Sequence, residues 1–267
     1  MQQEFDYEDL RRIAVKIAGE ASGMLRDLAC TSEKLGEKIS GETVRVDIIA
    51  EDYIVSGLRA ELGYDIRIVT EEKGVIGRGR LTAIVDPLDG SKNYLNCIPW
   101  ASVSIAFVPS NRSLRDVVAG AVSPIFYGEP ISFARGRGCR LGHSPVKKQE
   151  PPERFIYVYI EQPDAAHSVA KIIGELGGGY KIRSLGSAAL EISYVGLGRG
   201  TAFIDLRSKL RNVDLAAGLG VVLECGGDLI DGEGRPLDTP VDNVYRAGTV
   251  IAAPDKNLLK NIYGVLS

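Results

Sequence analysis

Apolar side chains recur every three or four positions over residues 6–30, at Leu10, Ile13, Ala14, Ile17, Ala21, Leu25 and Leu28. This spacing predicts an amphipathic helix. A second helix is expected from about Asp47 to Leu62, because Gly63 is a common stop signal. The polar stretch 31–43 between them contains two glycines and mixed charges, so we expect a mobile loop there.

Short apolar runs replace the helical pattern after residue 65. Residues 66–70 and 81–85 are typical of strands, and acidic residues follow each run directly. Residues 100–108 and 117–126 are further strand candidates, whereas 135–142 show no clear element. We place a soft lobe boundary near residue 145, because prolines follow there. An N-terminal α+β lobe would span 1–145 and a C-terminal α/β lobe 146–267.

Strand and helix patterns alternate in the second half of the chain. Strands are predicted over 155–160, 181–184, 201–206 and 250–253, and helices over 167–176, 188–197, 214–225 and 255–265. Such alternation is typical of an α/β lobe in which helices cover a sheet.

Composition narrows the function classes. The chain has 267 residues, 45% of them hydrophobic, and a formal net charge of -3, so neither nucleic acid nor a membrane is an expected partner. No apolar run is long enough to span a bilayer, and the acidic N-terminus shows no signal core. The four cysteines form no C-x-x-C pair, which favours a reduced, cytoplasmic protein, although a tertiary disulfide stays open. With two histidines, any metal should be held by oxygen atoms.

The hexapeptide 86–91 carries the clearest chemistry. Asp86 and Asp89 follow a buried strand, where carboxylates are costly unless a partner such as a divalent cation neutralises them. Gly90 lets the backbone approach a ligand, and N–H groups of Gly90 and Ser91 at a helix start would suit phosphate. The alternative is a surface turn, since Asp-Pro and Asp-Gly are ordinary turn dipeptides.

Further acids and small residues are candidates for the same site, and each of them also has a purely structural explanation. Glu71 and Glu72 end the preceding strand, and two adjacent strands could bring their acidic ends together. Asp214 opens a helix of small residues, where the helix dipole alone would also favour an acid. Residues 184–189 could cap a helix or present N–H groups to a ligand. Asp47 could cap the second helix or act as a base.

Together these segments resemble the inositol monophosphatase family, part of a larger group that includes fructose-1,6-bisphosphatases. Glu71-Glu72 is similar to the family's Glu-Glu pair, and 86–91 to its D-P-[LI]-D-G-[TS] motif. Residues 212–218 resemble its W-D-x-A-A-G motif and 184–189 its S-x-G-[ST]-A-A element. The four motifs occur in the family's order, and the resemblance covers residues 6–260. It implies a layered α-β-α-β-α sandwich and a homodimer.

The resemblance also implies an enzyme that uses two to three Mg²⁺ ions, or Mn²⁺, to hydrolyse phosphate esters by activating water. The implied metal ligands are Glu71, Asp86, the Leu88 carbonyl, Asp89 and Asp214. Glu71 would also help to place a third ion through waters. Ser91, where the family usually has Thr, would orient and deprotonate the attacking water with Asp47. The amides of Gly90 and Ser91 would hold the phosphate, while substrate hydroxyls would contact Asp89, Gly186 and Ser187.

Two departures from the family pattern bear on the substrate. Val213 replaces the family's Trp, which changes packing and leaves ligation intact. The stretch before Asp214 is basic, as in archaeal enzymes that hydrolyse both inositol monophosphate and fructose 1,6-bisphosphate. Arginine suits phosphate, so candidates for a distal phosphate are Arg183, Arg207, Lys209 and Arg211. The alternative is a solvated basic loop or a dimer contact.

We therefore expect a phosphatase for inositol 1-phosphate, fructose 1,6-bisphosphate or both, with a small phosphorylated sugar or inositol as its partner molecule. The main alternative is a 3′(2′),5′-bisphosphate nucleotidase or NADP phosphatase on the same metals, although no aromatic cluster can be assigned to a base. A protein that has lost catalysis is disfavoured, because all four acids are present at Glu71, Asp86, Asp89 and Asp214.

Overall fold

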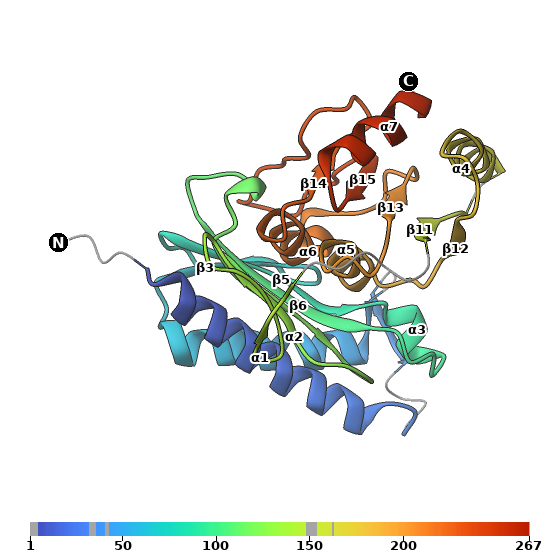
Figure 1. Cartoon of the computed structure of the whole chain (residues 1–267). Helices are drawn as coiled ribbons and strands as arrows, with labels where there is room; N and C mark the ends of the chain where they lie inside the picture. The colour runs from blue at the N-terminus through green and yellow to red at the C-terminus, as the bar shows by residue number, and fades with distance from the viewer. Residues whose placement is uncertain (1–4, 32–35, 41–42, 148–153, 162, 267) are drawn as a thin grey trace.

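The computed structural model describes residues 5–31, 36–40, 43–147, 154–161 and 163–266. Its elements form five layers in the order α-β-α-β-α (Figure 1), which confirms the predicted sandwich. The outer layers and the middle layer are helical, and an eight-stranded and a five-stranded sheet separate them. The helices are α1 (Tyr7–Leu28), α2 (Arg45–Leu62), the short α3 (Ser91–Leu95), α4 (Pro163–Glu175), α5 (Ala188–Gly196), α6 (Asn212–Glu224) and α7 (Lys256–Leu266).

The eight-stranded sheet has the order β10-β9-β8-β7-β6-β5-β3-β4. Neighbouring strands are antiparallel except for β3 and β5, which run parallel. Helices α1 and α2 cover one face, and α5 and α6 the other (Figure 1). The strands are β3 (Ile66–Thr70), β4 (Gly74–Ile76), β5 (Leu81–Asp89), β6 (Ser102–Pro109), β7 (Ala119–Pro124), β8 (Ile131–Ala134), β9 (Gly138–Leu141) and β10 (Ser144–Pro145).

The expectation that residues 135–142 contain no element is wrong. Strands β8 and β9 pair as an antiparallel hairpin there. Gly136 and Gly138 adopt φ values of 73° and 72°, a left-handed conformation that favours glycine, in and beside the tight turn between the strands. The strands are too short to show an apolar alternation, and β8 also pairs with the neighbouring β7.

The five-stranded sheet has the order β12-β11-β13-β15-β14. Strand β11 runs parallel to both of its neighbours, and β15 runs antiparallel to both of its own. Helices α4 and α7 pack on its outer face. The strands are β11 (Phe155–Tyr159), β12 (Lys181–Arg183), β13 (Ala202–Asp205), β14 (Asp228–Ile230) and β15 (Val250–Ala253).

One apolar core joins the two halves of the chain. Val69 and Ile84 of the large sheet belong to the same buried cluster as Leu219 of α6 and Phe203 of the small sheet. Helix α6 approaches the large sheet closely at Gly220, where a Cβ atom would lie 2.0 Å from the ring of Phe133. This core contains residues from both sides of residue 145. The predicted division into two lobes at that residue stays a prediction.

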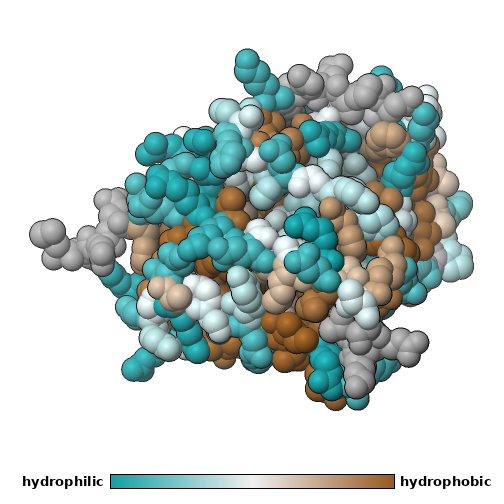
Figure 2. All heavy atoms as spheres, turned by 90° about the horizontal axis from the view of Figure 1, so that it is seen from below, coloured by the Kyte–Doolittle hydropathy of each residue, from teal (hydrophilic) through white to brown (hydrophobic). Residues whose placement is uncertain are grey.

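Helix α1 is amphipathic as predicted: its buried side includes Leu10, Ala14, Ile17 and Leu25. Its other side faces outward, and hydrophilic surface covers much of this side of the molecule, with hydrophobic patches between (Figure 2). No described helix is long and apolar enough to cross a membrane.

The segment between α1 and α2 was expected to be a mobile loop. Part of it forms a small antiparallel pair of β1 (Lys38–Ser40) with β2 (Thr43–Val44). Glu37 pairs with Arg45 at 2.6 Å, whereas Glu33 and Lys34 lie outside the described residues. The mobility of this segment stays a prediction.

All four cysteines form disulfides. Cys30 is bonded to Cys97 and Cys139 to Cys225, with Cα atoms 5.9 Å and 6.1 Å apart. The expectation of reduced thiols is therefore wrong, and the disulfide alternative that the sequence left open is realised. Sequence spacing could not reveal this, because the partners are 67 and 86 residues apart and only the fold brings them together.

Candidate active site

Two parallel strands bring the first two acids together. In the register of β3 and β5, Thr70 lies beside Val85. The next residues along the chain are Glu71 and Asp86, so both carboxylates lie at the same end of this strand pair. This confirms the expectation that adjacent strands bring their acidic ends to one place.

A bulge places the second aspartate of the hexapeptide. Asp86 pairs with Ser104 and Asp89 with Ser102, so three steps along β5 match two along β6. Pro87 lies inside this irregularity and has no N–H group for a regular ladder. Bulges of this kind re-aim side chains beside active sites. Here the sheet ends with both aspartates nearly fully buried.

A third carboxylate arrives from α6. Ligand oxygens of Glu71, Asp86 and Asp214 all lie within 4.8 Å of one another. Asp214 is fixed at the start of its helix, because Arg211 N donates a hydrogen bond of 2.7 Å to Asp214 Oδ2. Three converging carboxylates, two of them buried, offer the hard oxygen donors that Mg²⁺ or Mn²⁺ prefers, so the donor set fits such an ion.

The electrostatics of this carboxylate cluster favour a positively charged partner. Burial raises the pKa of Asp86 well above its usual range, and the nearby Glu71 raises it further. Burial also raises the pKa of Asp214 to about 6, partly offset by Arg211. Carboxyl groups resist ionisation when they are buried beside like charges, and a positive partner relieves this cost.

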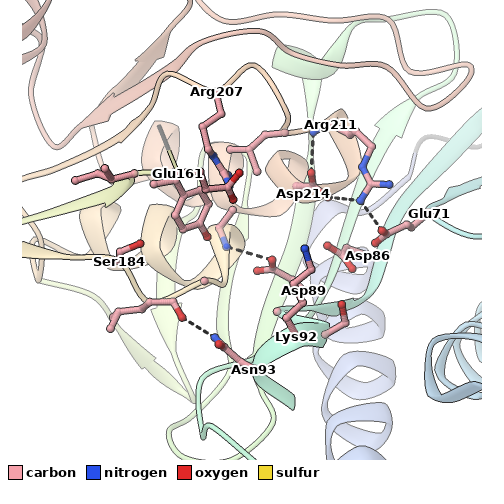
Figure 3. A pocket seen from close by; sticks show the side chains of 18 residues that line it. Glu71, Asp86, Asp89, Lys92, Asn93, Glu161, Ser184, Arg207, Arg211 and Asp214 are labelled. Atoms are coloured by element: carbon pink, nitrogen blue, oxygen red, sulfur yellow. Dashed lines mark hydrogen bonds and ion pairs between the residues drawn. The ribbon is translucent and has the colours of Figure 1, made fainter. Parts of the chain in front are cut away.

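Arg211 supplies positive charge within the cluster itself. Its Nη2 donates hydrogen bonds to Glu71 Oε1 at 2.5 Å and to Asp214 Oδ1 at 3.3 Å (Figure 3). The sequence marked this arginine only as a candidate for a distal phosphate. The structure instead places its guanidinium against two of the three clustered carboxylates.

Asp89 lies outside the carboxylate cluster and is bound to the start of α5. Its carboxylate accepts hydrogen bonds from Ser187 Oγ at 2.5 Å, Ala188 N at 3.1 Å and Ala189 N at 2.8 Å. Burial raises its pKa to about 7, against the effect of these donors. A helix N-terminus stabilises a carboxylate, so this aspartate caps a helix that begins almost a hundred residues later.

Two glycines let the backbone segments meet. Gly90 has φ 91°, and a Cβ atom there would lie 3.0 Å from the carbonyl oxygens of Gly186 and Trp100. Gly186 has φ 93°, and a Cβ atom there would lie 3.0 Å from Asn93 Nδ2. Asn93 in turn donates to Leu185 O at 2.5 Å, which holds the two segments together. The glycines are needed both for their conformation and for this close approach.

A cavity of about 400 Å³ opens beside the carboxylate cluster. Predicted site residues that line it are Glu71, Asp86, Asp89, Gly90, Ser91, Gly186, Arg207, Arg211 and Asp214. Predicted residues that do not are Asp47, Leu88, Arg183, Ser187 and Lys209.

The residues outside the cavity have other contacts. Ser187 is fully buried, and its hydroxyl donates a hydrogen bond to Asp89, so the structure places it against that side chain, while its predicted contact with substrate stays a prediction. Arg183 lies over the ring of Phe155, with its Cζ 4.7 Å from the ring centre. Lys209 pairs with the partly exposed Glu161. Leu88 is buried, and its N–H donates to Asp86 Oδ1 at 3.1 Å.

Asp47 both caps a helix and keeps one oxygen free of protein partners. Its Oδ2 accepts a hydrogen bond of 3.0 Å from Val44 N, so the capping alternative is correct. Its Oδ1 is buried and has no partner among the described residues. Burial raises the pKa of Asp47 to about 7, and the charges of Glu72 and Glu71 contribute.

The sequence missed several residues that line the cavity, and the polar ones among them are Lys92, Asn93, Tyr159 and Glu161. Lys92 and Asn93 directly follow the hexapeptide, so their position was a usable signal. Glu161 lies just beyond the carboxyl end of β11, where ligands of α/β sheets often bind. Arg207 lies against Tyr159, with its Cζ 4.2 Å from the ring centre, and pairs with Glu161 and the buried Asp205.

The chain is similar to known proteins over most of its length. The chain is 47% identical over 267 residues to an inositol-1-monophosphatase of Aeropyrum pernix, covering 97% of this chain and 98% of that protein. It is 31% identical over 227 residues to a fructose-1,6-bisphosphatase of Pyrococcus furiosus, covering 84% of each.

The fold has a similar solved counterpart, a Pyrococcus horikoshii protein described as having similarities to inositol-1-monophosphatase. It is 28% identical with a TM-score of 0.80, covering 98% of this chain and all of the other. A model of the inositol monophosphatase family matches residues 6–267, and this chain belongs to that family.

Proposed function

We propose that the protein is a magnesium-dependent phosphomonoesterase that hydrolyses inositol 1-phosphate, fructose 1,6-bisphosphate or both. The observation that carries the proposal is the convergence of Glu71, Asp86 and Asp214 within 4.8 Å beside a cavity. Relatives named for each of these activities support the choice of substrates.

The proposed metal ligands are the three clustered carboxylates, with Asp89 and the Leu88 carbonyl as further ligands of two to three Mg²⁺ or Mn²⁺ ions. When bound, such ions lower the pKa of a water molecule and offset the negative charge on the phosphate. Asp89 would have to share its oxygens between this role and the start of α5.

Asp47 is the proposed proton acceptor, together with the Ser91 hydroxyl. The pKa of about 7 and the unpartnered Oδ1 of Asp47 support this role, because a base works best when its pKa is near the working pH. Since Asp47 does not line the cavity, it would act through Ser91 or a water molecule. Glu71 would help to orient that water.

The proposed phosphate donors are the N–H groups of Gly90 and Ser91, which line the cavity. Asp89 and Gly186 would contact the substrate's hydroxyl groups. Arg207 is the proposed partner of a distal phosphate, because it lines the cavity while Arg183 and Lys209 do not. Its guanidinium is held by Tyr159 and Asp205, and such preorganisation favours binding of a second dianion.

A nucleotide substrate fits the cavity less well. Of the described residues that line it, Tyr159 is the one aromatic side chain. Its ring is 8% exposed and lies under the Arg207 guanidinium, so it offers no free face to a base. We therefore keep a nucleotidase or an NADP phosphatase as the second candidate.

One assay tests both candidates. Phosphate release would be measured with Mg²⁺ from inositol 1-phosphate, fructose 1,6-bisphosphate, adenosine 3′,5′-bisphosphate and NADP, each with and without EDTA. We expect activity on the first two that EDTA abolishes. Preference for adenosine 3′,5′-bisphosphate or NADP would reject the proposed sugar and inositol phosphate substrates. Activity that survives EDTA would reject the proposed metal dependence.

Two expectations from the sequence stay predictions. A homodimer is proposed from the resemblance alone and is testable by light scattering during gel filtration. A cytoplasmic location loses the support of reduced thiols, because the cysteines form disulfides.

A further inference from the structure

The Arg211 side chain contacts the same oxygens that a metal ion would use. Nη2 of Arg211 donates to Glu71 Oε1 at 2.5 Å and to Asp214 Oδ1 at 3.3 Å. Both acceptors belong to the carboxylate cluster whose ligand oxygens lie within 4.8 Å of one another. Figure 3 shows the guanidinium between these two side chains. A cation coordinated by them and a guanidinium bonded to them compete for the same lone pairs.

Electrostatics make this competition strong. Asp86 and Asp214 are buried, and the Arg211 guanidinium is a positive group bonded directly to their cluster. Removal of one partner from a buried or half-buried pair leaves an uncompensated charge. The guanidinium therefore stabilises a cluster of like charges, and an arriving divalent cation would both replace it and repel it.

The Arg211 side chain can leave while its backbone stays bound to Asp214. The side chain is 32% exposed and lines the cavity. The Arg211 backbone is fixed separately, through N–H donation to Asp214 Oδ2 at 2.7 Å and a β-bridge to Arg246. Because these are backbone contacts, the hydrogen bond to Asp214 Oδ2 does not depend on which side chain stands at position 211.

We propose that Arg211 is a resident counterion of the metal site, that divalent cations bind by displacing its guanidinium, and that the displaced guanidinium then pairs with the substrate phosphate. The proposal rests on the proposed function, since it takes the carboxylate cluster as the metal site. It makes Arg211 a positioning residue that links metal binding to phosphate binding. Such a link acts in both directions, so phosphate must also strengthen metal binding through Arg211.

The first test is the affinity for Mg²⁺ alone, measured by isothermal titration calorimetry without substrate. Arg211→Gln removes the competing charge, and we expect its Kd for Mg²⁺ to fall at least about fivefold, the lower end of usual linkage effects. Lys209→Gln is the matched control: it removes one positive charge two residues away, from a side chain that pairs with Glu161. Its Kd should change less than about twofold, because exposed charges are screened.

The second test is the affinity for inorganic phosphate at saturating Mg²⁺. Arg211→Gln should raise the Kd for phosphate at least about fivefold relative to the wild type and to Lys209→Gln. Arg211→Lys keeps the charge but loses the planar fork, so both of its Kd values should lie between those of wild type and Arg211→Gln. It also serves if the glutamine variant fails to fold.

Several results would overturn the proposal. If Mg²⁺ binds the wild type and Arg211→Gln equally, or binds the variant more weakly, the guanidinium does not compete, while the metal assignment stands. If phosphate binding at saturating Mg²⁺ is unchanged, the displaced guanidinium does not reach the phosphate. If Mg²⁺ binds neither protein, both this proposal and the metal dependence of the proposed function fail.

Discussion

Ser187 Oγ donates a hydrogen bond of 2.5 Å to Asp89 Oδ2, across 98 residues of sequence. Together with the N–H groups of Ala188 and Ala189, it ties the end of β5 to the start of α5. The aspartate that the hexapeptide motif marks for metal and substrate is thus also the cap of a helix from the other half of the chain. Loss of this side chain should therefore affect both stability and activity.

The cap gives a prediction about stability. Asp89→Ala should lower the free energy of unfolding by about 2 kcal/mol, because two helix N–H groups and the Ser187 hydroxyl lose their acceptor. Asp89→Asn keeps one oxygen acceptor and should cost less. Urea unfolding in EDTA would measure both without a contribution from metal. The idea fails if Asp89→Ala unfolds at the wild-type urea concentration.

The carboxylate cluster gives a prediction about catalysis. Asp86→Asn and Asp214→Asn should each lower kcat at least about a thousandfold, since several kcal/mol of charge stabilisation disappear with the metals. The fold should persist, because the amide keeps the shape of each side chain. Phosphate release at several Mg²⁺ concentrations would measure the effect, with circular dichroism as a check on folding. Near-normal rates in either variant would contradict the metal assignment.

The distal phosphate gives a prediction about specificity. Arg207→Ala should raise KM for fructose 1,6-bisphosphate about tenfold or more, because a charge-assisted pair with the second phosphate is lost. KM for inositol 1-phosphate should change little, since that substrate has no second phosphate. Lys209→Ala, whose side chain does not line the cavity, is the control. Equal effects of Arg207→Ala on both substrates would reject its proposed role.

Buried Glu191 gives a prediction about pH. Burial raises its pKa from 4.5 to about 8, so the folded protein holds this proton up to about pH 8. The unfolded chain releases this proton near pH 4.5. Between about pH 4.5 and pH 8 the unfolded chain therefore binds fewer protons than the folded protein, so the free energy of unfolding falls as the pH rises. The stabilisation that comes from the protonated Glu191 is fully present below about pH 4.5 and is lost by about pH 8.

Glu191→Gln removes this titration and keeps an oxygen for the hydrogen bond from Leu185 N, which is 2.9 Å from Glu191 Oε1. The variant should be more stable than the wild type by a few kcal/mol at pH 9, and the difference should vanish at acidic pH. Tm measured from pH 5 to pH 9 would show the two curves diverging. Parallel curves would show that this carboxyl does not change its protonation on folding in that range.

The disulfides give a prediction about redox conditions. Cys139 and Cys225 close 86 residues of chain, so Cys139→Ser should lower the free energy of unfolding by about 4.5 kcal/mol in the chain-entropy account. Dithiothreitol should lower the Tm of the wild type. It should lower that of Cys139→Ser less, because one disulfide is already absent there. A wild-type Tm that is unaffected by full reduction would contradict a stabilising role.

Much of this protein was predictable from local pattern. Helix α1, β15 and the acids at the ends of β3 and β5 follow from apolar spacing and from the charged residues beside it, because amphipathic periodicity reflects which side of an element is buried. The parallel pairing that puts Glu71 beside Asp86 was anticipated, since both acids end neighbouring apolar runs. The order of four short motifs was enough to identify the family.

Other features depend on contacts between distant residues, which no local pattern encodes. The hairpin of β8 and β9 continues a sheet in which β8 also pairs with β7. The sequence by itself determined which residues carry charge and where each strand and helix can form. Only the tertiary structure decided that Arg211 would enter the carboxylate cluster, that Asp89 would cap α5 and that Cys30 would meet Cys97. Each of these is set by the distance between side chains in space, and that distance is known only after both sheets have packed on the layer of α5 and α6.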